Sequence, residues 1–125
     1  MDDQQTTLAQ LRRVVAEFVA ERDWQQFHAP KNLAMALAIE AAELMEHYQW
    51  VDVDSSRTLA NDDLQRRVDV SDELVDVFCY TLALAEELGI DLSAALEAKM
   101  VKNRAKYPAE TYRGYYGQDD PNRPA

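Results

Sequence analysis

Residues 33–50, LAMALAIEAAELMEHYQW, form an apolar segment that carries two isolated acids. Leu, Ala, Met and Ile fill it, and up to position 45 the only charged side chains are Glu40 and Glu43, three residues apart. A helix this apolar is normally buried. Burying a carboxylate without a partner costs several kcal/mol or forces it to stay protonated. The segment therefore predicts a buried helix whose two acids need a counter-charge.

A second apolar segment, DVSDELVDVFCYTLALAEEL at 69–88, repeats this pattern. Four acids at positions i, i+3, i+4 and i+7 share one helix face: Asp69, Asp72, Glu73 and Asp76. Beyond Asp76 the same face continues to Tyr80, among apolar residues. Two apolar helices thus each carry a pair of acids three residues apart, E-x-x-E in the first and E-x-x-D in the second.

The acid pairs have several competing explanations. A solvated helix face is an equally good explanation for Asp69 and Asp72, but the inner four acids have apolar neighbours on both flanks. Neither apolar segment offers a Lys or Arg for ion pairs. A di-iron centre uses Glu-x-x-His, whereas His47 lies four residues after Glu43. All-oxygen ligands favour a hard cation, Mg²⁺ with Mn²⁺ as a substitute. The predicted metal ligands are Glu40, Glu43, Glu73 and Asp76.

Length and composition indicate a single all-α domain. The chain has 125 residues, 47% of them apolar and only three of them glycine. Its net charge of −10 argues against a DNA or RNA polymer as ligand. Its first residues lack the pattern of a signal peptide, and no segment is apolar enough to span a membrane. With the single Cys79 suited to a reducing compartment, we expect a cytoplasmic protein without membrane contact.

Four helices are expected, in a four-helix bundle-like arrangement: 7–22, 31–50, 61–88 and 91–106. Their predicted caps are a capping box of Thr7 with Gln10, then Asn61, Gly89, and Asp91 or Ser93. The domain covers residues 1–108, and 109–125 is a C-terminal tail, partly mobile. Because the second and third helices are apolar nearly all round, we expect chains to pair through them as a homo-oligomer, a dimer or a tetramer.

The end of the last helix, AKMVKNRAKYP at 98–108, is the one dense basic cluster in this acidic chain. Polar and basic residues share one helix face, with Arg104 beside it: Lys99, Lys102, Asn103 and Lys106. Such a cluster suits a triphosphate. Cations also gather at helix C-termini to complement the helix dipole, which explains Lys99 and Lys106 equally well.

Together these segments resemble the MazG-like, all-α nucleoside triphosphate pyrophosphohydrolases. The likeness is carried in order by ERDWQQFHAPKNLAMALAIEAAELMEHYQW at 21–50, DELVDVFCYTLALAEELGIDL at 72–92 and KMVKNRAKYP at 99–108, and it is greatest to the dCTP pyrophosphatase branch. Two alanines stand between the first pair of acids, where relatives often have a glycine. The Tyr-rich tail has no counterpart in the resemblance.

The resemblance implies hydrolysis between the α- and β-phosphates of a nucleoside triphosphate, with the four acids as Mg²⁺ ligands. It implies phosphate binding by Lys102, Asn103, Arg104 and Lys106. Base or sugar contacts are expected from Trp24, His28, Trp50 and Tyr80, whereas Phe27 suits an ordinary core position. We expect dCTP or modified dCTP as the substrate, in nucleotide pool sanitation. The alternatives are the same chemistry on dUTP or on a broad range of NTPs, and a non-catalytic, metal-binding helical interaction module.

Overall fold

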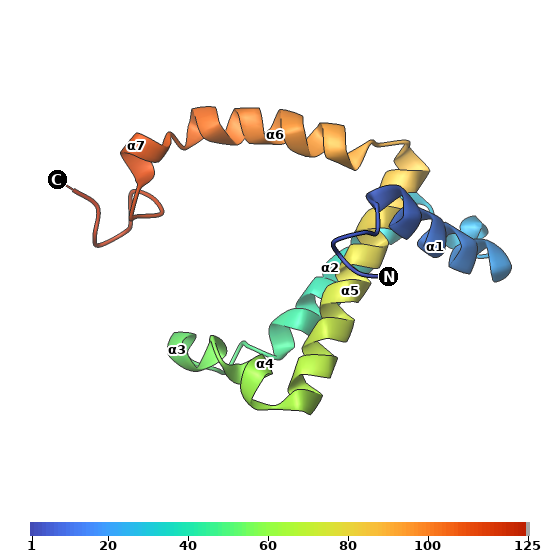
Figure 1. Ribbon diagram of the computed structural model, residues 1–125, viewed down its shortest axis with the longest axis horizontal. Coiled ribbons are helices and arrows are strands. Elements are labelled where there is room, and N and C mark those ends of the chain that lie inside the picture. The colour runs from blue at the N-terminus through green and yellow to red at the C-terminus, as the bar shows by residue number, and fades with distance from the viewer. Residues whose placement is uncertain (125) are drawn as a thin grey trace. The chain divides into compact units, whose positions relative to one another are not determined.

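The computed structural model describes residues 1–124, which are helical with no strand (Figure 1). The all-α prediction is confirmed. The chain forms two compact units, residues 1–90 and residues from 91 onward. The first contains α1 (Leu8–Glu21), a 3₁₀ turn η1 (Gln25–Phe27), α2 (Pro30–Glu46), α3 (Val53–Ser56), α4 (Leu59–Asp62) and α5 (Leu64–Leu88). The second contains α6 (Leu92–Lys106) and α7 (Ala109–Tyr112).

Most helix ends lie where the sequence predicts them. Thr7 and Gln10 form the expected capping box at the start of α1. Gly89 ends α5 in the left-handed conformation, with φ of 64°, which glycine adopts without steric cost. The Asp91 carboxylate accepts a hydrogen bond from the Ala94 N–H and caps α6. Local capping chemistry therefore fixes the ends of three helices.

The predicted cap at Asn61 is wrong. Asn61 lies inside α4, one of two short helices between α2 and α5. The cap of α5 is Asp63, whose extended backbone lets its carboxylate accept hydrogen bonds from the N–H groups of Gln65 and Arg66. The Asn61 side-chain oxygen instead accepts a hydrogen bond from the Arg67 guanidinium at 2.9 Å.

The second predicted helix is also four residues too long. It ends at Glu46, and the chain then forms tight turns. The Tyr48 N–H donates to the Met45 carbonyl at 2.9 Å, and the Val51 N–H donates to the Tyr48 carbonyl at 3.0 Å. This three-residue spacing is that of turns rather than of an α-helix. Trp50 therefore lies outside α2.

The core of the first unit joins three helices. The α2 helix packs along α5, and α1 and α4 also pack on α5 (Figure 1). Four buried apolar residues lie in α1, α2 and α5: Val19, Leu33, Leu82 and Ala85. Arg12 fastens α1 to the end of α5, because its guanidinium pairs with Glu86 at 3.0 Å and donates to the Ile90 carbonyl at 2.7 Å.

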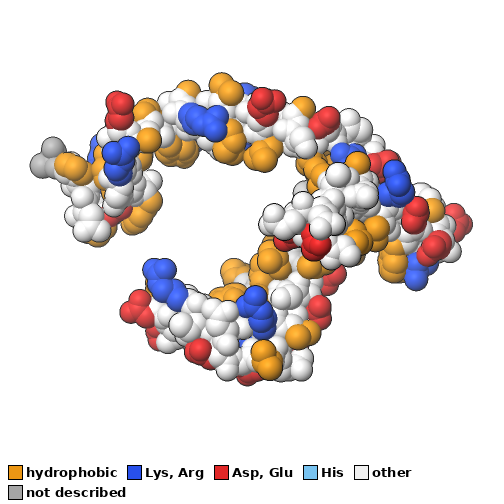
Figure 2. Space-filling view, in the orientation of Figure 1, with side chains coloured by type: hydrophobic (Ala, Val, Ile, Leu, Met, Phe, Trp, Pro, Cys, Tyr) orange, Lys and Arg blue, Asp and Glu red, His pale blue; other side chains and the backbone are white. Residues whose placement is uncertain are grey.

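Apolar side chains remain on the surface of the first unit (Figure 2). On α2, Met35, Ile39 and Met45 are each more than half exposed. On α5 the exposed large apolar residues are Leu64, Val68, Leu74, Val75, Phe78 and Leu88. Among residues 1–124, no helix combines the length and the apolar character needed to cross a membrane.

The second unit has local order beyond α6. Tyr112 meets Tyr107 edge-on, with ring centroids 5.3 Å apart, and lies 5.8 Å from the ring of Tyr115. The buried Asp120 carboxylate accepts hydrogen bonds from the N–H groups of Tyr116 and Asn122. Thus the predicted tail contains a short helix and a side-chain-supported turn. That α6 completes a four-helix bundle with the first unit stays a prediction.

Candidate active site

The two acid pairs meet where α2 lies beside α5. Glu40 of α2 and Glu73 and Asp76 of α5 each offer a carboxylate oxygen, and these oxygens lie within 4.8 Å of one another. Glu43, one turn after Glu40 on α2, lies close enough to Glu40 and Glu73 to raise the pKa of both. The i, i+3 spacing on each helix brings all four carboxylates to one place, because residues three apart share a helix face.

Burial and mutual repulsion make these acids hard to ionise together. Partial burial, a hydrogen bond that protonated Glu40 donates to Glu43, and the charges of Glu43, Asp76 and Glu73 raise the pKa of Glu40 to about 7. Burial and then the charge of Glu43 raise the pKa of Glu73 above its ordinary value. Closely spaced carboxylates repel unless protons or a cation neutralise them. Near neutral pH the four carboxylates therefore carry negative charge that the described part of the protein does not balance with positive charge.

One atom of the cluster has no partner in the described chain. The Oε2 atom of Glu73 is buried and accepts no hydrogen bond. Leaving a buried acceptor unpaired costs free energy, and each such group in a native structure calls for an explanation. Within residues 1–124 the ion pairs are Arg12–Glu86 and Arg22–Glu21, neither at the cluster. An all-carboxylate set with an orphaned oxygen fits a divalent cation.

His47 lies near the carboxylate cluster. It is the C-terminal cap of α2, one turn after Glu43. Its charge opposes the rise in the pKa of Glu73. Sequence reasoning weighed His47 only as a di-iron ligand, and the missed signal is its i, i+4 relation to an acid of the cluster.

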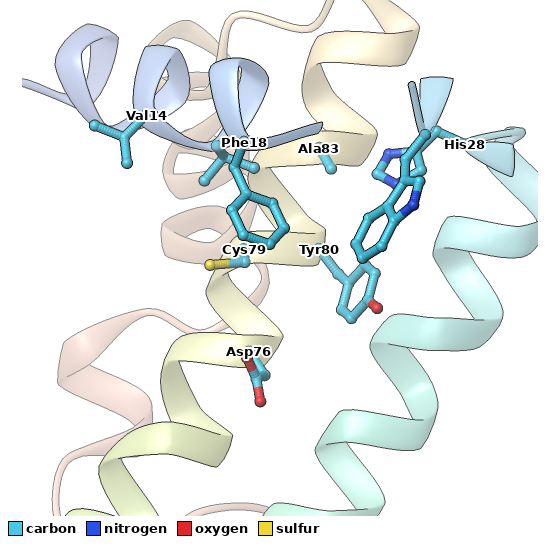
Figure 3. Close-up of a pocket in the computed structure, with 9 residues that line it drawn as sticks. Val14, Phe18, His28, Asp76, Cys79, Tyr80 and Ala83 are labelled. Atoms are coloured by element: carbon cyan, nitrogen blue, oxygen red, sulfur yellow. The ribbon is translucent and has the colours of Figure 1, made fainter. Parts of the chain in front are cut away.

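A pocket of about 360 Å³ adjoins the acids (Figure 3). It is lined by Val14, Val15, Phe18, Trp24, His28, Asp76, Cys79, Tyr80 and Ala83. Asp76 belongs both to this lining and to the carboxylate cluster. The rest of the lining is mostly aromatic or apolar, with few polar groups, which is the usual make-up of a small-molecule site. The apolar pocket therefore borders the carboxylate cluster at Asp76.

The expected base and sugar residues divide between two places. Trp24, His28 and Tyr80 line the pocket. Trp50 does not line it and is 90% exposed, in the turns after α2. Phe27, expected in the core, is exposed as well. Sequence reasoning missed Phe18 in the lining, because its spacing in α1 is that of an ordinary core residue.

Two groups in the pocket are held in their neutral forms. Burial, with the charge of Asp76, raises the pKa of the Cys79 thiol. Burial and the nearby charges of Glu40 and Asp76 raise the pKa of Tyr80. At neutral pH the pocket therefore presents a thiol and a phenol rather than two more anions, and the negative charge stays at the carboxylate end.

The expected phosphate residues all lie on α6, in the second unit. Lys102, Asn103, Arg104 and Lys106 fall in its last two turns. Among the described residues none of the three cations is in an ion pair. The Lys106 ammonium lies 5.2 Å from the centre of the Tyr107 ring. These charges are thus free to meet an anion.

The chain is similar to known proteins in sequence and in fold. Residues 35–116 match the MazG-like family. The chain is 43% identical over 108 residues to dCTP pyrophosphatase 1 of Bos taurus and 44% identical over 107 residues to that of Homo sapiens. These alignments cover 86% of this chain but only 63% and 62% of the relatives, so the chain spans less than two thirds of their length.

A solved structure agrees in fold and in sequence. The crystal structure of a pyrophosphatase from Archaeoglobus fulgidus has a TM-score of 0.76 and 34% sequence identity to this chain. The match covers 86% of this chain and 98% of that one. It bears out the resemblance drawn from the acid pairs and their flanking motifs. The chain belongs to the MazG-like family.

Proposed function

We propose that the chain is a nucleoside triphosphate pyrophosphohydrolase that converts dCTP, or a modified dCTP, to the monophosphate and pyrophosphate. The observation that carries the proposal is the double role of Asp76, which lies in both the carboxylate cluster and the aromatic pocket. The names of the dCTP pyrophosphatase relatives support the choice of substrate.

The order of groups along α5 supports cleavage next to the nucleoside. From Asp76 the pocket extends through Tyr80 to Ala83, seven residues and about 10 Å of helix. A nucleoside held in the pocket brings its own α-phosphate to the acidic end. The β- and γ-phosphates then lie beyond the cluster. This arrangement favours attack at the α-phosphorus over attack at the terminal phosphate.

We assign the metal site to Glu40, Glu43, Glu73 and Asp76, with Mg²⁺ as the ion and Mn²⁺ as a substitute. Bound there, the ion supplies positive charge to the phosphate oxygens and lowers the pKa of a water molecule. A carboxylate of the cluster accepts the proton of the attacking water. The new bond joins the water oxygen to the α-phosphorus, the bond from that phosphorus to the bridging oxygen breaks, and pyrophosphate leaves.

The pocket residues select and hold the nucleoside. Trp24 and Phe18 offer aromatic surfaces for stacking on the base, which gives affinity with little base selectivity. Selectivity then needs hydrogen bonds to the base edge, and His28 is the side chain we assign to this. Tyr80, which lines the pocket, is proposed to contact the sugar, where a bulky ring disfavours a 2′-hydroxyl. Lys102 and Asn103, with Arg104 and Lys106, are proposed to bind the phosphates.

A homo-oligomer remains part of the proposal. The exposed residues Met35, Ala38, Ala42 and Met45 of α2 follow the 3–4–3 spacing of a helix-pairing seam. All four side chains are apolar, and the two alanines allow close approach of a second helix. We propose that this face, with the exposed apolar residues of α5, pairs two copies of the chain.

Pyrophosphate release tests the function. Purified protein with Mg²⁺ is assayed on dCTP, 5-methyl-dCTP, dTTP, dUTP, dATP, dGTP and CTP. We expect the highest kcat/KM for the cytosine deoxynucleotides, and loss of release in Glu73→Gln with the helical circular dichroism retained. Asp69→Asn, an acid on the same helix outside the cluster, is the control and keeps activity. Turnover of every nucleotide alike would overturn the substrate, and silence of folded protein across the panel would overturn the reaction.

A further inference from the structure

The chain reverses at Asp23, between α1 and the pocket wall. Asp23 is the one non-glycine residue with positive φ in the described part of the chain, at 52°. Its N–H donates to the Ala20 carbonyl, and the next N–H, of Trp24, donates to the Val19 carbonyl, each at 3.1 Å. This pair of bonds is a Schellman motif, whose left-handed position usually holds glycine. Aspartate tolerates that conformation better than most side chains.

The turn fixes the position of Trp24. Its backbone N–H donates to the carbonyl of Val19, one of the few buried residues of the first unit. Its indole lines the pocket and meets the Phe18 ring edge-on, with centroids 5.7 Å apart and planes at 76°. Between the buried Val19 and the pocket wall, the chain therefore turns at one left-handed residue, Asp23.

Neighbouring side chains close the turn from both sides. The Arg22 guanidinium lies 3.7 Å from the centre of the Phe18 ring and donates to the Phe18 carbonyl at 3.0 Å. The Gln26 amide donates to the Asp23 carbonyl at 2.9 Å. Asp23 itself does not line the pocket. The Asp23 carboxylate also accepts a hydrogen bond from the Gln26 amide, at 3.4 Å. Asp23 can therefore act on the pocket through its backbone or through this contact.

We propose that Asp23 is a positioning residue for the nucleotide pocket, because its left-handed backbone sets the Trp24 indole against Phe18. This inference rests on the proposed function for its kinetic readout. The requirement is conformational rather than electrostatic. A residue that accepts positive φ keeps Trp24 in its position in the pocket. A β-branched residue displaces Trp24, because positive φ is a steric outlier for such residues.

Three substitutions at one position separate the backbone from the carboxylate. Asp23→Gly and Asp23→Asn keep access to positive φ, one without a side chain and one without the charge. Asp23→Val removes that access. Each is measured for kcat and KM on the best nucleotide of the panel, with circular dichroism to monitor folding. A Trp50→Phe background leaves Trp24 as the sole tryptophan, whose emission maximum and nucleotide quenching report the wall directly.

We expect Asp23→Val to raise KM at least about fivefold with kcat within about twofold of wild type. Its Trp24 emission shifts to the red, and Asp23→Gly and Asp23→Asn match wild type. A wild-type KM and emission in Asp23→Val would overturn the inference, as would an equal loss in Asp23→Gly. If wild type hydrolyses no nucleotide, the proposed function fails, and the emission of Trp24 across the three variants still decides the inference.

Discussion

Without a divalent cation, the first unit should become more stable as pH falls from 8 to 5. Glu40 has a folded pKa of about 7 against an ordinary value of 4.5. A carboxyl whose pKa is raised by folding binds its proton more tightly in the folded state. Its stabilising contribution is therefore complete below about pH 4.5 and is lost as pH rises through 7.

The two pKa values set the size of this effect. Taken in full, they give roughly 2.5 kcal/mol more stability at pH 5 than at pH 8. Glu40 is only partly buried, and solvent screening reduces the figure, so we expect between about 1 and 2 kcal/mol. The raised pKa of Glu73 acts in the same direction.

Urea unfolding in EDTA, followed by circular dichroism at fixed protein concentration, measures the effect. The Glu40→Gln variant removes the titrating group and keeps the shape of the side chain. At each pH we subtract the free energy of unfolding of Glu40→Gln from that of wild type, which cancels the titration of groups common to both proteins. This difference should rise as pH falls from 8 to 5. A difference that stays flat within about 0.5 kcal/mol, or that falls, would refute the reasoning.

Three other results are expected. Addition of Mg²⁺ should raise the melting temperature more at pH 8 than at pH 5, because protons compete for the same carboxylates, and equal shifts at both pH values would contradict this. The Leu82 side chain is 2% exposed, and Leu82→Ala leaves a cavity that should lower the free energy of unfolding in urea by about 2–5 kcal/mol. The control Leu88→Ala, at an exposed position, should lower it by less than about 1 kcal/mol. Arg12→Met should cost about 1 kcal/mol by losing the bonds to Glu86 and Ile90, whereas Arg13→Met, exposed and outside the ion pairs, should cost little. An equal loss of stability in both arginine variants would contradict this, because the effect would then come from removing a positive charge rather than from the bonds of Arg12.

Signals local in sequence predicted the helices well. Caps at Thr7 and Asp91 and the stop at Gly89 depend on residues within four positions of each other, so the sequence contains the whole interaction. The predicted cap at Asn61 was wrong because a second capping residue, Asp63, lies two positions later and has the extended backbone that a cap requires. Two rival caps differ by conformational details that spacing does not reveal.

The candidate site was predictable where it depends on helix periodicity. The i, i+3 pairs predicted that Glu40 and Glu43 share a face, and the structure brings that face to Glu73 and Asp76. Phe18 was missed because its part in the pocket comes from the turn that carries Trp24 back beside it. Such a contact depends on backbone conformation, as at Asp23, which residue type alone only weakly indicates.

The position of attack on the triphosphate tests the central claim most directly. Hydrolysis of dCTP in ¹⁸O-labelled water with Mg²⁺, followed by mass spectrometry of the products, shows which phosphorus receives the water oxygen. Because the carboxylate cluster adjoins the nucleoside pocket through Asp76, we expect the label in dCMP and none in pyrophosphate. Label in pyrophosphate, or release of labelled orthophosphate, would contradict attack at the α-phosphorus and with it the proposed joining of pocket and metal site.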